Sequence, residues 1–312
     1  MSFYLKKFLD FLTTLILISL LTFAVFQILP GNPALVILGP NAEEAQIASL
    51  EQKMNLDKPI AERYFLWILG VFHGDFGTSY QYDQSVSRLI RGSFCVTASL
   101  SVLTLTFALL IGLFFGFFYA YIHKSRFFTL FSTLHQIWFS VPSFCTALLL
   151  ILIFSVKSGL FPAMGYSPLS EGFFSWFRSL FLPAFSLSLG SGAILARYTT
   201  TSILTQEKQD YVRTARSKGL SEWQVISRHI LRNALLPSVT TLGLIITEIL
   251  GGSIIIENVF SLPGIGRLIA SSILSRDFPL IQALVLYLSL ITLFCNFLVD
   301  IVYSLIDPRI RR

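Results

Sequence analysis

The side chains best suited to chemistry lie between Asp210 and Pro237, the most basic stretch of a largely apolar sequence. Six cationic residues gather in this stretch or at its edge: Lys208, Arg213, Arg216, Lys218, Arg228 and Arg232. Guanidinium and ammonium groups at this density offer electrostatic recognition of a partner's carboxylates. A simpler interpretation of the same charges is a loop that faces lipid headgroups and sets the membrane topology.

The local pattern of this stretch predicts a helix, a break and a second helix. Gly219 can take the left-handed conformation that ends a helix, and Lys218 before it suits the negative helix end. Ser221 and Gln224 fit a capping box that begins the next helix. The second helix should place Trp223, Ile226, Ile230 and Ala234 on one face and Gln224, Arg228 and Arg232 on the other. Pro237 is expected to mark the change into a new membrane segment.

The same residues resemble the coupling loop of ATP-binding-cassette importer permeases of the dipeptide, oligopeptide and nickel transport family. Positions 210–220 read DYVRTARSKGL, where that family typically reads DYVRTARAKGL, and positions 229–237 match its H-x-L-R-N-A-L-L-P pattern. The broader importer pattern begins Glu-Ala-Ala and reaches Leu-Pro sooner, so the likeness is to the peptide branch. The resemblance implies ATPase-coupling roles for Asp210, Tyr211, Arg213, Thr214, Ala215, Arg216, Lys218, Gly219 and Leu220. Tyr211 and Ala215 lie four residues apart and are expected to present one packing face to the ATPase.

The composition is that of a membrane protein. Of the 312 residues 54% are hydrophobic and 13% are charged, and the mean hydropathy is +0.71. A membrane-spanning helix needs about 20 apolar residues. Runs of that kind cover about 11–29, 94–121, 128–154, 180–203, 238–256 and 280–305, the third with a kink at Pro142. We therefore predict an all-α membrane protein with six transmembrane helices.

The distribution of Lys and Arg orients these spans. One set of predicted segments holds Lys6, Lys7, Lys124, Arg126, the basic residues of 204–237, Arg309, Arg311 and Arg312, and the short loops of the other set hold only Lys157, Arg178, Arg267 and Arg276. The positive-inside rule then puts both termini in the cytoplasm, together with the coupling hairpin between helices 4 and 5. The predicted division is 1–30 for the N-terminus and first helix, 31–93 for a large external loop, and 94–312 for a five-helix permease core that includes the coupling loop 204–237. The family implies a bacterial cytoplasmic (inner) membrane.

Further motifs of the family fall in the predicted external segments. The family's E-x-V-F-x-x-P-G-x-G-R signature matches Glu257, Phe260, Pro263, Gly264 and Gly266 of this chain, with Asn258 where Thr is usual. Residues 73–79, 276–279 and 296–309 resemble its G-D-L-G-x-S, R-D-Y-P and N-x-x-x-D-x-x-Y-x-x-x-D-P-R motifs. The loop 31–93 is expected to form either an ordered external cap or a docking surface for a substrate-binding protein.

Two features concern the interior of the membrane. Glu248 lies near the middle of the fifth span, where a carboxylate costs roughly 2.5–3.5 kcal/mol. It therefore lines the translocation path or packs, hydrogen-bonded, against a neighbouring helix. Gly112 and Gly116 form a small-xxx-small pattern that allows another helix to approach closely.

Several kinds of chemistry are not expected. The sequence has no G-x-x-x-x-G-K-[ST], H-E-x-x-H or G-x-S-x-G motif, so neither ATP hydrolysis nor a catalytic or metal site is predicted on this chain. Asp75 and Asp83 lie outside the apolar runs and do not form an intramembrane protease pair. Cys95, Cys145 and Cys295 stand scattered in apolar runs as small hydrophobes. The net charge of +6 fits topology signals better than nucleic-acid binding.

The resemblance implies the permease subunit of an ATP-driven importer for di- or oligopeptides. Its partners would be a second similar permease, two ATPase subunits that bind ATP and Mg²⁺, an external substrate-binding protein, the peptide and the lipid membrane, with no cofactor on this chain. Glutathione or a nickel chelate is the alternative cargo. A secondary carrier is a more distant alternative, since it should hold more mid-membrane ionisable groups than Glu248.

Overall fold

The computed structural model describes residues 3–28, 34, 38–39, 42–53 and 56–306, and its regular structure in these ranges is helical, as predicted. The helices of the first third are α1 (Phe3–Ile28), α3 (Glu44–Lys53), α4 (Ile60–Phe72) and α5 (Val86–Ile122). They are followed by α6 (Phe127–Phe139), α7 (Ser143–Leu150), the π-helix η1 (Ile151–Lys157), the 3₁₀-helix η2 (Leu169–Glu171) and α8 (Phe173–Glu207). The remainder comprises α9 (Asp210–Ser217), α10 (Glu222–Gln224), the π-helix η3 (Val225–Ile230), α11 (Leu231–Val259), α12 (Ile265–Ser275) and α13 (Phe278–Ile306). The boundary predicted between residues 30 and 31 and the last three residues of the motif at 296–309 lie outside the described residues.

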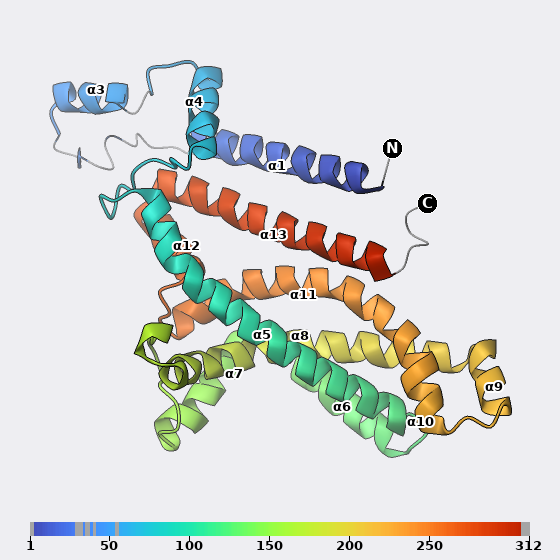
Figure 1. Ribbon diagram of the computed structural model, residues 1–312. Helices are drawn as coiled ribbons and strands as arrows, with labels where there is room; N and C mark the ends of the chain where they lie inside the picture. Colours follow the sequence, from blue (N-terminus) through green and yellow to red (C-terminus); the bar gives the residue numbers. More distant parts are fainter. Residues whose placement is uncertain (1–2, 29–33, 35–37, 40–41, 54–55, 307–312) are drawn as a thin grey trace.

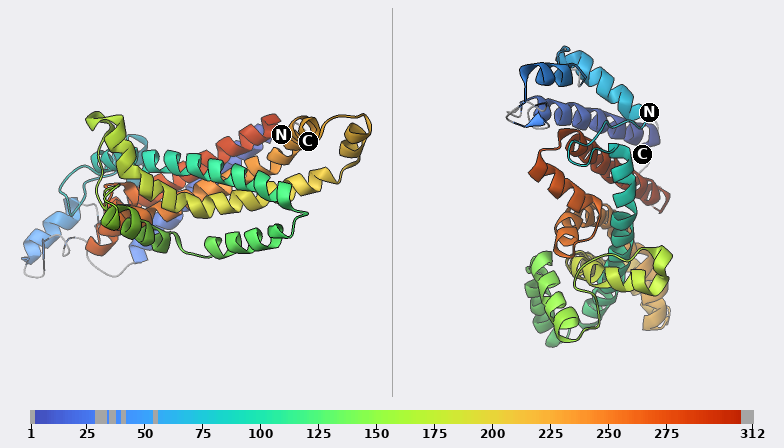
Figure 2. Two further views of the ribbon diagram at one scale, coloured as in Figure 1. Left: turned by 90° about the horizontal axis from the view of Figure 1, so that it is seen from below. Right: turned by 90° about the vertical axis from the view of Figure 1, so that its left-hand side faces the viewer.

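The long helices run side by side along the bundle, and the short elements gather at its two ends (Figures 1 and 2). The start of α1, the end of α13 and helix α9 lie at one end, which we name the α9 end. Helices α4, α7 and α12 lie towards the other, the α12 end. This is the arrangement expected if both termini and segment 204–237 share one side of a membrane.

Within the described residues, five helices are long and apolar enough to span a membrane: Tyr4–Gln27, Val86–Ile122, Phe173–Glu207, Thr241–Val259 and Phe278–Leu305. The third predicted span is not a single kinked helix. It is α6 followed by α7 and η1, with Pro142 as the N-cap of α7. Proline lacks an amide N–H and disfavours helical backbone in the residue before it, so position 142 separates two helices.

Other boundaries also differ from the sequence prediction. Helices α5 and α8 begin about two turns earlier than expected, and α12 fills a segment predicted as an external loop. Helix α11 continues without a break from Leu231 to Val259, so position 237 does not start a new helix. Pro237 is the seventh residue of α11, where a proline removes one intrahelical hydrogen bond without ending the helix.

Helix α8 is the centre of the bundle. Its side chains join those of α5 and α11 in the largest buried cluster, which includes Leu100, Leu187, Leu195 and Ile249. Helices α5 and α8 approach closely because α5 carries glycines where they meet. A Cβ atom placed on Gly112 would lie 2.6 Å from Leu195 Cβ, and one on Gly116 would lie 2.6 Å from Thr199 Cβ. The predicted role of this small-xxx-small pattern is confirmed.

Gly112→Ala should therefore lower the stability of the bundle by roughly 1–3 kcal/mol, because the added methyl group forces α5 away from α8. Gly92→Ala is the matched control on the same helix, since a Cβ there meets nothing within 4 Å. Thermal unfolding of the two variants in detergent measures the difference. Equal melting temperatures would contradict the close α5–α8 approach.

Helices α1 and α13 form a peripheral pair. Lys7 Nζ on α1 lies 2.7 Å from Asp300 Oδ2 on α13, and Ser304 Oγ donates to the hydroxyl of Tyr4 at 3.2 Å. In the most apolar 18-residue stretch of each helix, only 17% of the residues of α1 and 6% of those of α13 are buried inside the chain. Their outer surfaces are thus available to lipid.

Candidate functional site

Helix α9 separates its residues into a buried and an exposed face. Val212 is fully buried and Ala215 is 5% exposed, and both join a cluster at the α9 end. The other members of this cluster are Ala120, Ile203, Val225, Ile230 and Ala234. The exposed side carries Asp210, Tyr211, Arg213, Thr214, Arg216 and Lys218. We call this set the α9 surface.

This division corrects two sequence predictions. Ala215 does not share an outward face with Tyr211, because it packs with Val212 against the chain's own helices, and Leu220 also packs against that cluster. In the following helix, Ile226, Ile230 and Ala234 face the cluster as predicted, whereas Trp223 is 76% exposed and Val225 is buried instead. The reason is the π-helical segment η3, which adds a residue to the turn and rotates the side chains before it.

The turn after α9 has the predicted chemistry. Gly219 has φ +77°, the left-handed conformation that ends α9 after Lys218. The capping box is also present, because Ser221 N donates to Gln224 Oε1 at 3.2 Å and Gln224 N donates to Ser221 Oγ at 3.4 Å. These local bonds fix the path between α9 and α10.

Glu207, the last residue of α8, was not predicted as a site residue. Its Oε1 lies 3.3 Å from Arg216 Nη2 and 3.7 Å from Lys124 Nζ, and its Oε2 lies 3.8 Å from His123 Nε2. One carboxylate thus joins the end of α8, helix α9 and the α5–α6 loop. An acidic residue directly before Lys208, the first cation of the basic stretch, was the available signal, but the partners at 123 and 124 are far away in sequence.

At the α12 end, Glu257 holds the predicted external signature together. Its carboxylate is fully buried, accepts from Thr97 Oγ1 at 2.7 Å, and accepts from Arg267 N at 3.1 Å. Thr97 Oγ1 in turn accepts from Ile265 N at 2.8 Å, which ties α5 to the start of α12.

The remaining signature residues fit around this carboxylate. A Cβ on Gly264 would collide with Glu257, and one on Gly266 would lie 2.5 Å from Ile254 Cα. Phe260 is buried, whereas Pro263 is exposed at the turn. No side chain larger than that of glycine fits at 264 and 266. The signature residues therefore hold α11, α5 and the start of α12 together, and we call this arrangement around Glu257 the Glu257 lock.

A second buried carboxylate connects the loop before α5 to α13. Asp277 is fully buried and accepts from Ser79 Oγ at 2.5 Å and from Gln81 N at 3.2 Å. The two motifs at 73–79 and 276–279 thus meet in space. Burial, followed by the negative charge of Asp277, raises the pKa of the neighbouring Tyr80 far above its ordinary value, so its hydroxyl keeps its proton.

Glu248 lies on the exposed side of α11 and borders a cavity of about 210 Å³. The cavity is lined by the α6–α7 break at Pro142, by Thr146 of α7, by Gly190 of α8 and by Gly252 of α11. Glu248 is therefore not enclosed by the helices of its own chain. The structure separates it from the α9 surface and from the Glu257 lock, which lie on other elements of the bundle.

Comparison with known proteins identifies the family over the whole chain. Residues 108–312 match the model of the binding-protein-dependent transport system inner membrane component, and residues 1–101 match the model of its N-terminal part. A solved chain of the MetNI methionine ABC transporter, in an inward-facing conformation, shares the fold with a TM-score of 0.59 at 16% identity. That match covers 70% of this chain and 96% of the solved chain.

Curated relatives match at full length. A protein of Brucella abortus (strain 2308) named a peptide transport system permease is 39% identical over 307 residues, 98% of each chain. A protein of Salmonella typhimurium named glutathione transport system permease GsiC is 38% identical, covering 100% of this chain and 99% of its own. A protein of Sinorhizobium fredii named a peptide ABC transporter permease is 34% identical over 99% of each chain. This chain is a multi-pass membrane protein that belongs to the family of binding-protein-dependent transport system inner membrane components.

Proposed function

We propose that this chain is the permease subunit of an ATP-driven importer of short peptides in a bacterial inner membrane, and that the α9 surface is its contact with an ATPase subunit. The observation that carries the proposal is the construction of α9. One face is fixed to the transmembrane helices by buried Val212 and Ala215, while the other presents Tyr211, Thr214 and Lys218 to a partner. A helix held in this way transmits a push as a rigid body.

The Glu207 network adds a second connection. Because Glu207 binds Arg216 of α9 and Lys124 of the α5–α6 loop, a displacement of α9 is passed to α8 and α5 together. These two helices pack closely against each other through Gly112 and Gly116. Movement of that pair would alternate access to the path between inward- and outward-open states.

The other partners follow from the family. The chain has too few spans to enclose a path alone, so a second similar permease is proposed beside it, with two ATPases that bind ATP and Mg²⁺ and an external substrate-binding protein. Hydrolysis takes place on the ATPases, and this chain has no catalytic role. Peptide is the proposed cargo because relatives from Brucella and Sinorhizobium carry that name, and glutathione, itself a tripeptide, is the second candidate because of the Salmonella relative.

Glu248 is proposed to line the path. Its exposure beside the α6–α7 break supports this role over packing against a neighbouring helix, since a lipid-facing carboxylate at mid-span would be costly. Uptake of cationic and neutral peptides by Glu248→Gln tests the role. Unchanged uptake of both classes would place Glu248 outside the path.

The whole proposal is tested by purifying the tagged chain from native membranes in mild detergent and identifying the proteins that accompany it by mass spectrometry. We expect an ATPase and a second permease. The double variant Tyr211→Ala, Arg213→Glu should lose the ATPase at least about tenfold while keeping the second permease, since the α9 surface touches only the former. Glu171→Ala, an exposed change at the α12 end, is the control. Recovery of the chain alone, or as a homo-oligomer without an ATPase, would contradict the proposal.

A further inference from the structure

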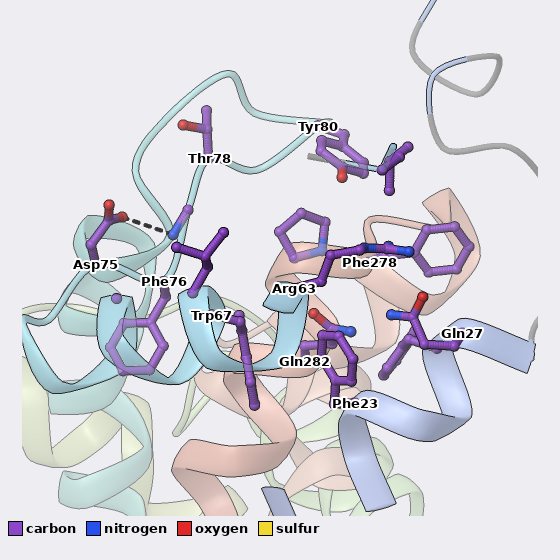
Figure 3. Close-up of a pocket in the computed structure, with 16 residues that line it drawn as sticks. Phe23, Gln27, Arg63, Trp67, Asp75, Phe76, Thr78, Tyr80, Phe278 and Gln282 are labelled. Carbon is purple, nitrogen blue, oxygen red and sulfur yellow. Dashed lines mark hydrogen bonds between the residues drawn. The ribbon is translucent and has the colours of Figure 1, made fainter. Parts of the chain in front are cut away.

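A further cavity lies at the α12 end, away from α9 and Glu248. It measures about 460 Å³ and lies between α1, α4, the start of α13 and the loop at 75–80 (Figure 3). Aromatic side chains form much of its wall: Phe23, Phe26, Trp67, Phe76, Tyr80 and Phe278. Its polar groups are Arg63, Asp75, Thr78 and the amides of Gln27 and Gln282. The transport mechanism proposed above uses none of them.

The position of α4 sets the depth of this cavity in the membrane. The hydroxyls of Tyr64 on α4 and Ser19 on α1 hydrogen-bond at 2.8 Å, and the Phe23 ring lies 5.4 Å from the Tyr64 ring and 5.8 Å from the Trp67 ring. The apolar span of α1 ends at Gln27, eight residues beyond Ser19. At 1.5 Å per residue, Tyr64 contacts α1 about 12 Å inside the end of that span.

The opposite face of α4 agrees with this depth. Phe65, Leu69 and Phe72 follow one stripe of the helix and are 66%, 50% and 82% exposed in the chain. In Figures 1 and 2, α4 crosses α1 at an angle near the α12 end, and Tyr64 and Trp67 of α4 contact α1. A short helix that crosses the end of a span, with apolar side chains outward, has the geometry of a helix lying in the interfacial region of the bilayer. The predicted external loop 31–93 thus includes a part with the geometry of a membrane-interface helix.

The charges of the cavity indicate what it binds. Figure 3 shows Arg63 extending from α4 between Tyr80 and Gln282. A guanidinium at the membrane boundary pairs with phosphate through charge-assisted hydrogen bonds, and the Tyr80 hydroxyl can add another donor. Asp75 lines the same cavity, where its Oδ1 accepts from Gly77 N at 2.9 Å. A carboxylate on the other side of the cavity from the guanidinium (Figure 3) favours a headgroup with an ammonium in addition to its phosphate.

We propose that this cavity binds an ethanolamine phospholipid of the outer leaflet, with its phosphate on Arg63, its ammonium towards Asp75, and its acyl chains along the apolar surface of α1 and α4. A lipid is favoured over a peptide because the cavity lies on the peripheral α1–α13 pair, whose outer surfaces are exposed. The bound lipid would hold α4 to the membrane and stabilise the loop at 75–80, and through Ser79 and Asp277 the start of α13.

The test measures phospholipid retained by the purified full-length chain, by mass spectrometry of the extracted lipid. Arg63→Gln should lower retained phosphatidylethanolamine at least about tenfold, which is the loss expected for a charge-assisted hydrogen-bonded pair. Lys58→Gln is the matched control, because Lys58 pairs with Glu62 at 3.0 Å and does not line the cavity. Equal retention by the two variants would overturn the proposal.

A second measurement uses Trp67 as a local reporter. In a chain that keeps Trp67 and has Phe at 138, 176 and 223, phosphatidylethanolamine brominated on its acyl chains should quench the fluorescence in vesicles, and Arg63→Gln should reduce that quenching severalfold. Phosphatidylglycerol brominated in the same way should quench less. Release of the lipid by millimolar inorganic phosphate, or by a tripeptide at its transport concentration, would show a soluble anion or cargo site instead and would overturn the proposal.

Discussion

Replacing Ala215 by Asp is expected to reduce ATP-dependent peptide uptake and ATPase co-purification at least about tenfold. Ala215 is 5% exposed and lies in the apolar cluster that fixes α9 to α8 and α11. Burying a carboxylate there without a partner costs about 3 kcal/mol or more in free energy, so α9 would no longer pack against the cluster. Uptake in reconstituted vesicles and the mass-spectrometric pull-down measure the two effects.

Ala215→Ser is the control for this change. A serine hydroxyl in a helix can bond to the carbonyl four residues earlier, so it fits a small buried site with little loss. We therefore expect near-normal uptake from Ala215→Ser. Full uptake by Ala215→Asp would mean that transport does not depend on the packed position of α9, and the lever account would fail.

Glu257→Ala is expected to destabilise the chain by about 3–5 kcal/mol. The substitution leaves the Thr97 hydroxyl and the Arg267 N–H without their buried acceptor, at about 1–3 kcal/mol for each such group, and it opens a cavity under the turn at 260–264. Thermal unfolding in detergent and the amount of folded chain in membranes should both fall. The reason is structural, so variants that remain folded should still bind the ATPase.

Glu171→Ala serves as the comparison for Glu257→Ala. Glu171 lies at the same end of the bundle in the short helix η2, but its side chain is exposed, so its loss should change stability by less than about 0.5 kcal/mol. A melting temperature for Glu257→Ala equal to that of Glu171→Ala would show that the buried carboxylate does not hold the signature together.

Features that depend on neighbouring residues were predicted from the sequence, whereas contacts between residues far apart in the chain were not. Apolar runs located the long helices, and local turn chemistry located the Gly219 stop and the Ser221–Gln224 cap, because each depends on residues within a few positions. The family motifs pointed to Glu257, Gly264 and Gly266, yet their function as a lock depends on Thr97, which lies 160 residues away. No pattern in the sequence links these positions.

The errors have equally specific causes. Helical periodicity assigned Trp223 to the buried face, but the π-helical turn that follows it rotates Trp223 out of line with Ile230 and Ala234, which are buried. Spacing placed Tyr211 and Ala215 together, although a small apolar residue next to Val212 is better explained by burial. The ion pairs of Glu207 were not predicted because two of its partners, His123 and Lys124, lie in the loop between α5 and α6. Local rules cannot register such long-range contacts.

The central claim is that the exposed side of α9 meets an ATPase while its other side holds the helix in the bundle. Single cysteines introduced at Thr214 and at Val212, in a chain whose Cys95, Cys145 and Cys295 are replaced by Ala, test it through cross-linking in native membranes. The account predicts a cross-link to an ATPase subunit from position 214 and none from position 212. A cross-link to the ATPase from neither position, or from position 212 alone, would contradict it.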